Sequence, residues 1–250
     1  MSGLTVSSED RVARVVFDRP DVLNALSPSV LGSLVDACAA LAKNVEIRVV
    51  RFEGAGGSFS AGADLPAFLS TLGGGDARSV ADLGRRATNA VADLPQITIA
   101  GIRGHCVGGG LVLAAACDIR IGADDARFLI PELDAGIPLA WGGMAWLVRL
   151  VGETLAADLV LSCRPFDAQE ALQAGFLSRA VGPDALEGEL HALEQAIAAK
   201  ARNVLRVTKR QLREIRDGTF DARKDADALL GALDDPESRQ QGMAYVATRI

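Results

Sequence analysis

The chain has 250 residues, of which 49% are hydrophobic and 23% are charged, and its net charge is −6. This composition is typical of a globular protein that is long enough for one large domain, or for one domain with an appendage. The chain has no basic stripe with interleaved aromatic residues, and its longest nearly uncharged run, 135–148, is shorter than the roughly 20 residues that span a bilayer. We therefore expect neither nucleic-acid binding nor a membrane span.

Cysteine and histidine are few and scattered along the chain. Three of the four cysteines lie in apolar runs, the usual setting of a small buried hydrophobic residue, and no spacing typical of a metal site occurs. We therefore expect no metal and no disulfide framework. Residues 1–5 contain no basic segment that leads into an apolar core, so we expect no signal peptide and a soluble protein of the cytoplasm.

The first part of the chain alternates between strand and helix patterns. Its helix start is marked by Ser27 or Ser29, either of which can cap the helix, with Pro28 suited to the first turn. In chain order, the predicted elements are a strand over 11–17, a loop over 20–26, a helix to Lys43, a strand over 47–52, a glycine-rich bend over 54–58, a flexible break over 73–75 and a helix over 77–94.

The middle of the chain repeats a unit of strand, strand and helix. Strands are predicted over 97–102, 118–121 and 127–130, and a glycine-rich helix that ends near Cys117 follows the first of them. Alternating strands and helices indicate an α/β fold with right-handed crossovers.

Charged amphipathic helices dominate the chain from about Val181 onward. They are predicted over 183–202, 204–216, 221–232 and 235–248. Several apolar stripes in so small a region need a neighbour to cover them, which indicates oligomerisation. The basic face over 200–216 is expected to be solvated, although binding of a phosphate-bearing cofactor stays open.

The segment 60–65 reads Ser-Ala-Gly-Ala-Asp-Leu and enters a helix. In one interpretation, the free amide of Ala61 points at a ligand oxygen. In the other, Gly62 supports a tight turn and Asp64 caps the helix. The motif alone favours the turn, because glycine turns are common.

Gly108, Gly109 and Gly110 open an apolar helix. The run matches neither the dinucleotide-binding fingerprint nor a P-loop. Each glycine in a helix interior is unfavourable by about 1 kcal/mol relative to alanine, a cost that close packing or a ligand would explain. Both explanations stay open, although a helix N-terminus does favour an anion.

Glu132 stands alone in an apolar stretch after the predicted strand 127–130. A carboxylate in such surroundings can have a raised pKa, which suits general acid/base catalysis. The alternative is a glutamate on the surface of a loop.

Four segments occur in an order that resembles the crotonase superfamily, the enoyl-CoA hydratase/isomerase family. They are 59–65, 104–118, 131–138 and 166–177, and the resemblance extends from 19–26 to 242–244. It implies a crotonase-like spiral of ββα repeats over 1–182 and a helical trimerisation region over 183–250, with trimers or hexamers as the assembly. It also implies an acyl-CoA substrate, of which coenzyme A is a part, so that no separate cofactor is needed.

The resemblance also implies roles for individual residues. The amides of Ala61 and Gly109 match the positions of the family's oxyanion hole, and Glu132 matches a catalytic glutamate. The residues that fall where the family lines its CoA cleft are Val22, Ala25, Ala63, Asp64 and Leu65.

One position departs from the hydratases of the family. Val112 stands where they carry a first glutamate, and valine cannot hold water or carry a proton. The single Glu132 resembles the pattern of Δ3,Δ2-enoyl-CoA isomerases, with Val112 in the apolar wall, so we expect isomerisation of a 3-enoyl-CoA to a 2-enoyl-CoA. The alternatives are a 2-enoyl-CoA hydratase of the fatty-acid β-oxidation type and a non-catalytic acyl-CoA binder. Leu139 and Trp141 are bulky where the family often has small residues, and they are expected to shape the acyl pocket.

Overall fold

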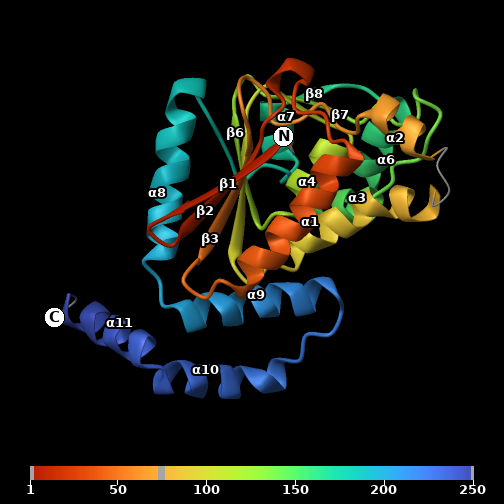
Figure 1. Ribbon diagram of the computed structural model, residues 1–250. Coiled ribbons are helices and arrows are strands. Elements are labelled where there is room, and N and C mark those ends of the chain that lie inside the picture. The colour runs from red at the N-terminus through yellow and green to blue at the C-terminus, as the bar shows by residue number, and fades with distance from the viewer. Residues whose placement is uncertain (1–2, 73–76, 249–250) are drawn as a thin grey trace.

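A six-stranded sheet forms the centre of the computed structural model, which describes residues 3–72 and 77–248 (Figure 1). The predicted break over 73–75 lies outside these residues. β1 is antiparallel to β2, and the other neighbouring strands are parallel. In spatial order the strands are β1 (Leu4–Glu9), β2 (Val12–Phe17), β3 (Val49–Gly54), β4 (Ile97–Ile102), β6 (Ile119–Ala123) and β9 (Arg179–Val181).

A second, smaller sheet lies beside the first, and two of its strands connect a main strand to the helix that follows. It consists of β5 (His105–Val107), β7 (Arg127–Leu129) and β8 (Phe166–Asp167). The chain runs β4, β5 and α4 (Gly109–Ala116), and then β6, β7 and α5 (Gly143–Val151). The predicted repeat of strand, strand and helix is therefore confirmed, and with it the α/β class.

The two faces of the large sheet are covered by different helices, because side chains alternate along each strand. Val50, Phe52 and Ile102 belong to the large core, which includes residues of α1 (Pro28–Lys43), α3 (Ala77–Ala92) and α4. Val49 and Ile99 belong to a smaller core under α8 (Leu186–Ala198). Ser27, not Ser29, caps α1, since its Oγ accepts a hydrogen bond from the Val30 amide at 3.3 Å.

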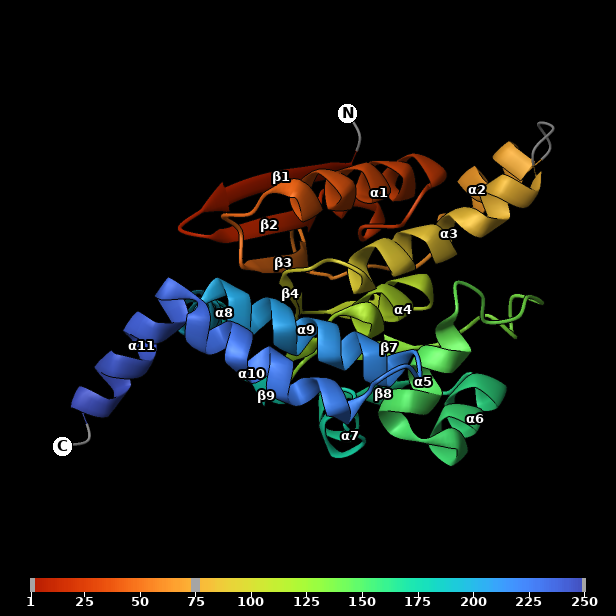
Figure 2. The same cartoon turned by 90° about the horizontal axis from the view of Figure 1, so that it is seen from below.

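The last helices lie side by side on one face of this body, and only the final one points away from it (Figure 2). α9 (Arg202–Arg216) is held against the sheet by Lys209, whose Nζ lies 2.7 Å from a carboxylate oxygen of Asp118. α10 (Asp225–Asp234) and α11 (Pro236–Ala247) contain no buried residues. The division of the chain into 1–182 and 183–250 stays a prediction, although α8, the first helix after it, packs on the sheet.

The remaining helices are shorter and join these layers. They are α2 (Leu65–Leu72), α6 (Glu153–Ser162), α7 (Ala168–Gln173) and three 3-10 turns, at Pro20–Val22, Pro183–Ala185 and Ala222–Lys224. Within the described residues, no helix combines the length and the apolar character needed to cross a membrane.

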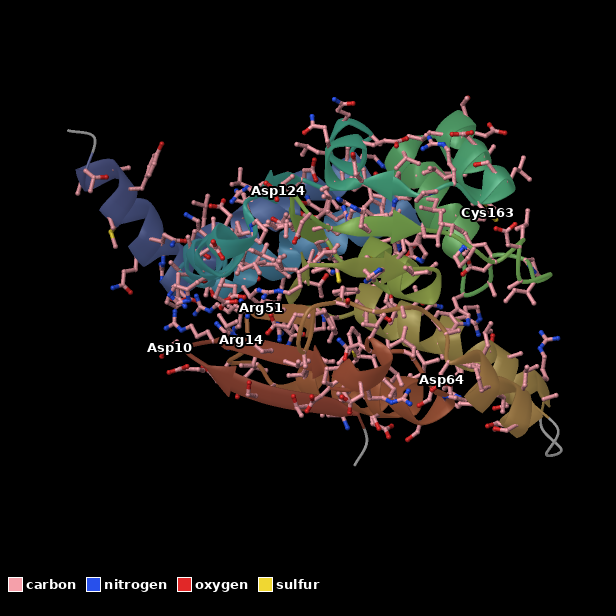
Figure 3. All side chains as sticks on the ribbon, turned by 90° about the horizontal axis from the view of Figure 1, so that it is seen from above. Asp10, Arg14, Arg51, Asp64, Asp124 and Cys163 are labelled. Atoms are coloured by element: carbon pink, nitrogen blue, oxygen red, sulfur yellow. The ribbon has the colours of Figure 1, made fainter. Side chains whose placement is uncertain are left out.

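A buried ion cluster joins β3 to α8. Arg51 is only 2% exposed and forms ion pairs with Glu53, Glu187 and Glu194. In Figure 3, Arg51 and Arg14 lie close together, and Asp64 lies apart from them, to their right. The cluster is therefore part of the scaffold that joins α8 to the sheet.

Candidate active site

A cavity of about 250 Å³ opens at the start of α4, where four segments of the chain meet. Within the described residues, Glu132 is the one acidic side chain that lines it. The other lining residues are apolar or glycine: Ala63, Leu65, Phe68, Leu69, Ala81, Gly109, Val112, Ile137, Pro138, Leu139, Ala140 and Trp141. The tertiary structure thus brings the predicted residues Ala63, Leu65, Gly109, Val112 and Glu132 together.

Glu132 follows β7 and is half-buried. Its Oε2 is buried and, among the described residues, accepts no hydrogen bond. Burial raises the pKa of this carboxyl above its ordinary value, because the charged form loses hydration. A carboxylate of this kind is suited to accept and return a proton.

Each of the three glycines at the start of α4 leaves room for a different neighbouring side chain. Gly108 has a φ of +49°, and a Cβ on it would lie 2.6 Å from Oε1 of Glu132. A Cβ on Gly109 would lie 2.2 Å from the ring of Trp141, and one on Gly110 would lie 2.7 Å from Cβ of Ser60. Close packing therefore explains the run, and it also brings the carboxylate of Glu132 to the N-terminus of α4.

Two backbone amides in the cavity wall are free to donate. The first intrahelical bond of α4 runs from the Val112 amide to the Gly108 carbonyl at 3.0 Å, which leaves the Gly109 amide in the unpaired first turn. On either side of Ala63, the Gly62 carbonyl accepts from the Leu26 amide at 2.8 Å and the Asp64 amide donates to the Leu26 carbonyl at 3.0 Å, so the bridge to Leu26 does not use the Ala63 amide. In the part of the chain that the structure describes, neither the Ala63 nor the Gly109 amide has an acceptor.

The expectation that the Ala61 amide faces a ligand is wrong. This amide donates to the carbonyl oxygen of Leu23 at 2.8 Å, and Ala61 does not line the cavity. The positive φ of Gly62, +89°, turns the chain so that the next free amide is that of Ala63. The local sequence contains two alanines around one glycine, and only the pairing with distant residues distinguishes them.

Asp64 takes the structural role that the sequence left open. Its Oδ1 accepts from the Ala67 amide at 3.2 Å at the start of α2, and its Oδ2 lies 2.8 Å from Nη1 of Arg19. Arg19 Nη1 also donates to the Ala25 carbonyl at 2.6 Å. Val22 lines a separate open groove. Val22, Ala25 and Asp64 therefore lie outside the cavity that holds Glu132, and their contact with CoA stays a prediction.

Val112 contributes an apolar wall at the position where the sequence departs from hydratases of the family. It is 1% exposed, and a Cβ on Gly143 would lie 2.7 Å from Cγ2 of Val112, so the start of α5 packs directly on it. Together with Leu139 and Trp141 it makes the surroundings of Glu132 hydrophobic. Sequence reasoning missed Phe68 and Ile137, which carry no signal beyond their hydrophobicity.

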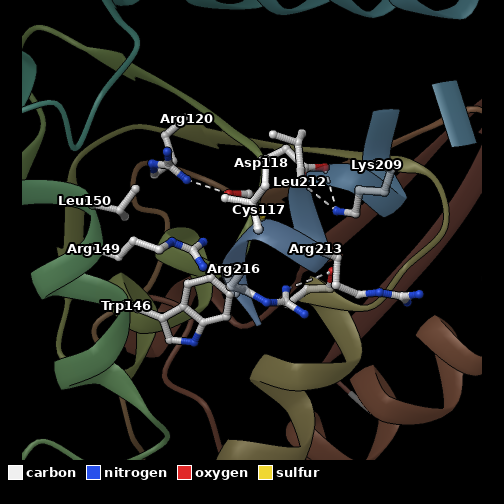
Figure 4. Close-up of a pocket in the computed structure, with 13 residues that line it drawn as sticks. Cys117, Asp118, Arg120, Trp146, Arg149, Leu150, Lys209, Leu212, Arg213 and Arg216 are labelled. Atoms are coloured by element: carbon white, nitrogen blue, oxygen red, sulfur yellow. Dashed lines mark hydrogen bonds and ion pairs between the residues drawn. The ribbon is translucent and has the colours of Figure 1, made fainter. Parts of the chain in front are cut away.

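A second cavity, of about 240 Å³, lies between α5 and α9 (Figure 4). Arginines and Trp146 line it, and the carboxylate in its wall, Asp118, is already bound by Lys209 and by the amide and hydroxyl of Thr98. Both oxygens of this carboxylate are therefore already hydrogen-bonded within the protein. The cavity around Glu132 is therefore the better candidate for an acid/base site.

Comparisons with known proteins identify the family to which the chain is similar. A family model described as enoyl-CoA hydratase/isomerase matches residues 7–249. A crotonyl-CoA hydratase from Syntrophomonas wolfei is 32% identical over 207 residues, which are 82% of this chain and 79% of that protein.

Solved structures show the same fold. An enoyl-CoA hydratase/carnithine racemase from Magnetospirillum magneticum is 31% identical with a TM-score of 0.92, and the match covers 99% of this chain and 94% of that one. A Thermobifida fusca protein described as an enoyl-CoA hydratase, solved with acetoacetyl-CoA, is 30% identical with a TM-score of 0.85, over 93% of this chain and 95% of that one. The chain therefore belongs to the enoyl-CoA hydratase/isomerase family of enzymes, the crotonase superfamily.

Proposed function

We propose that this enzyme binds an acyl-CoA thioester in the cavity around Glu132 and moves protons on its acyl chain. The thioester oxygen accepts hydrogen bonds from the amides of Ala63 and Gly109. Such donors stabilise the enolate that forms when C2 loses a proton or when hydroxide adds to C3, and removal of one typically slows a reaction about 10²–10³-fold. The observation that carries this proposal is the Glu132 carboxylate, whose buried Oε2 has no partner among the described residues, beside two free amides in one apolar cavity.

Hydration of a 2-enoyl-CoA is the first candidate reaction, because the names of the relatives favour it. The Syntrophomonas wolfei protein is a crotonyl-CoA hydratase, and the Thermobifida fusca protein is described as an enoyl-CoA hydratase with a bound acyl-CoA. In this reaction Glu132 takes a proton from water while the hydroxide bonds to C3. The proton then goes to C2 of the enolate, so that the elements of water are added and nothing is oxidised or reduced.

Isomerisation of a 3-enoyl-CoA is the second candidate, and Val112 is the observation that favours it. Glu132 would remove a proton from C2 and return it at C4, which moves the double bond into conjugation with the thioester. This shift needs one base and no water. An apolar wall at Val112 and Leu139 supports it by keeping water away from the carboxylate.

A pair of substrates distinguishes the two reactions. The purified protein is given crotonyl-CoA, whose conjugated absorbance falls on hydration, and in a separate assay 3-hexenoyl-CoA, whose absorbance rises on isomerisation. Glu132→Gln is assayed in parallel and is expected to lose about 10²–10⁴-fold in rate with either substrate, because the proton acceptor is gone.

The two rates decide between the reactions. Faster turnover of crotonyl-CoA supports hydration, and faster turnover of 3-hexenoyl-CoA supports isomerisation. An unchanged rate in Glu132→Gln removes this residue from the mechanism. Tight binding of both acyl-CoA compounds without turnover indicates a non-catalytic binder and refutes the catalytic proposal.

A further inference from the structure

Trp141 adopts a backbone conformation that bulky residues rarely take. Its φ is +59°, in the left-handed region, and the next residue, Gly142, has a φ of +77°. A positive φ in a tryptophan is unfavourable and persists only where the surrounding structure enforces it. The side chain is nevertheless well packed, since it is only 9% exposed.

Two glycines on different helices make room for the indole ring. A Cβ on Gly84 of α3 would lie 2.0 Å from the ring, and one on Gly109 of α4 would lie 2.2 Å from it. The centroid of the Phe68 ring on α2 lies 6.1 Å from that of Trp141. The ring therefore fills the space between α3 and α4, and it lines the same cavity as Glu132.

We propose that Trp141 determines substrate specificity by closing the end of the acyl pocket, so that the enzyme prefers short acyl chains. The inference rests on the proposed acyl-CoA function and names its substrate class. The indole contacts Gly109, whose free amide is one of the two proposed donors to the thioester oxygen. An acyl chain that starts at this amide therefore meets the ring within a cavity of about 250 Å³.

Binding of unreactive saturated thioesters tests this directly, because the readout does not depend on turnover. Dissociation constants are measured for butyryl-CoA and decanoyl-CoA with the full-length protein and with Trp141→Ala. The variant is expected to raise the affinity for decanoyl-CoA relative to butyryl-CoA by about tenfold or more, since methylene groups in an apolar pocket contribute strongly to discrimination. Trp141→Leu, which keeps an apolar side chain in place, serves if Trp141→Ala does not fold.

Trp146 provides a matched control. It is also a buried tryptophan, 8% exposed, but it lines the second cavity between α5 and α9 (Figure 4). Trp146→Ala is expected to leave the ratio of the two dissociation constants unchanged. A similar change of the ratio in both tryptophan variants would indicate general loosening of the fold and would overturn the proposal.

A double-mutant cycle with Gly84 distinguishes closure of the acyl pocket by the Trp141 ring from a general loss of fold stability. Gly84 lies in α3 without a positive φ, so alanine suits the helix, but its Cβ forces the indole to move. Gly84→Ala is expected to change the ratio of the dissociation constants in the wild-type background and to change it less than about twofold in Trp141→Ala, because the colliding ring is then absent.

The outcomes are distinguishable. If neither thioester binds the wild-type protein, the proposed function fails and the inference fails with it. If both bind but the ratio is the same in wild type, Trp141→Ala and Trp141→Leu, the acyl-CoA function stands and the role of Trp141 is refuted. A shifted ratio in the Trp141 variants, together with coupling to Gly84, is the expected result.

Discussion

The carboxyl group of Glu132 lies in an environment that disfavours its charged form. Its buried Oε2 lacks a hydrogen-bond partner within the described residues, and the loss of hydration raises its pKa. A buried polar atom without a partner destabilises a folded protein, typically by about 1–3 kcal/mol. This conflict between stability and chemistry is common at active sites, and it makes Glu132 testable apart from any substrate.

The stability of Glu132→Gln is expected to exceed that of the wild type at neutral pH. Because the folded pKa of Glu132 is raised, protonation favours the folded state. The destabilising effect of the ionised Glu132 carboxylate is absent below the unfolded pKa, which is about 4.3 for a glutamate. The effect grows as the pH rises to the folded pKa and is full above it. Urea unfolding of both proteins should therefore give similar free energies at the acid end and a more stable variant at pH 7. A variant that is less stable at pH 7 would contradict this.

Val112 is expected to control the choice between the two reactions. Val112→Glu places a second carboxylate in the cavity that Glu132 lines and gives water a second acceptor. We expect the ratio of hydration to isomerisation to rise by about tenfold or more, since each acid/base group contributes about 10²–10⁴-fold. Rates with crotonyl-CoA and 3-hexenoyl-CoA measure this ratio, and Val112→Leu is the apolar control. The same ratio in all three proteins would exclude Val112 from the choice.

The start of α4 shows how one element assembles the site. Its three glycines allow Glu132, Trp141 and Ser60 to approach the helix, each from a different part of the chain. The helix start also leaves the Gly109 amide without an intrahelical acceptor, at a residue that lines the cavity. The sequence identifies the glycine run as costly. The side chains that require it, Glu132, Trp141 and Ser60, are 24, 32 and 50 positions away from the glycines that they contact, so only the fold shows the reason.

Gly108→Ala is expected to destabilise the fold modestly and to lower turnover strongly. The Cβ would lie 2.6 Å from Oε1 of Glu132, and the φ of +49° is unfavourable for alanine, by roughly 1–2 kcal/mol. We expect turnover to fall by at least about tenfold, because even a small misplacement of a catalytic group is costly. The matched control is Gly188→Ala on α8, where a Cβ meets nothing within 4 Å. Equal activity in both variants would refute the steric argument.

Elements were predictable where their hydrophobic pattern is strong. α1, α3, β2 and β4 match the predicted segments closely, since each buries one face or both faces in the core. β1 was missed because it is an exposed edge strand, held by pairing with β2 more than by burial. Edge strands of this kind lack the alternation on which sequence reasoning depends.

The whole molecule exposes apolar side chains on its last helices. On α10, Leu229, Leu230 and Leu233 are more than half exposed, and on α11 the same holds for Met243 and Val246. Large exposed apolar surfaces of soluble proteins usually contact a partner. The trimer or hexamer that the sequence predicts would cover them.

Charged residues on α10 are expected to disrupt this assembly. The protein should sediment as a trimer or hexamer, and the double variant Leu229→Asp, Leu233→Asp should lower its mass, because two buried carboxylates oppose the interface. Leu161→Asp on α6 is the control, since Leu161 is 70% exposed outside the C-terminal helices. A wild-type protein that is monomeric at micromolar concentration would contradict the prediction.

The sequence by itself determined the α/β class, the repeated unit of strand, strand and helix, and the family, and it singled out Glu132 and Val112, which line one cavity. These features depend on local periodicity and on short motifs, which each segment carries alone. The tertiary structure decided that the free amide belongs to Ala63 and not to Ala61, and that Trp141 lies between Gly84 and Gly109. Both outcomes depend on hydrogen bonds and packing between segments far apart in the chain, and no local pattern encodes such contacts.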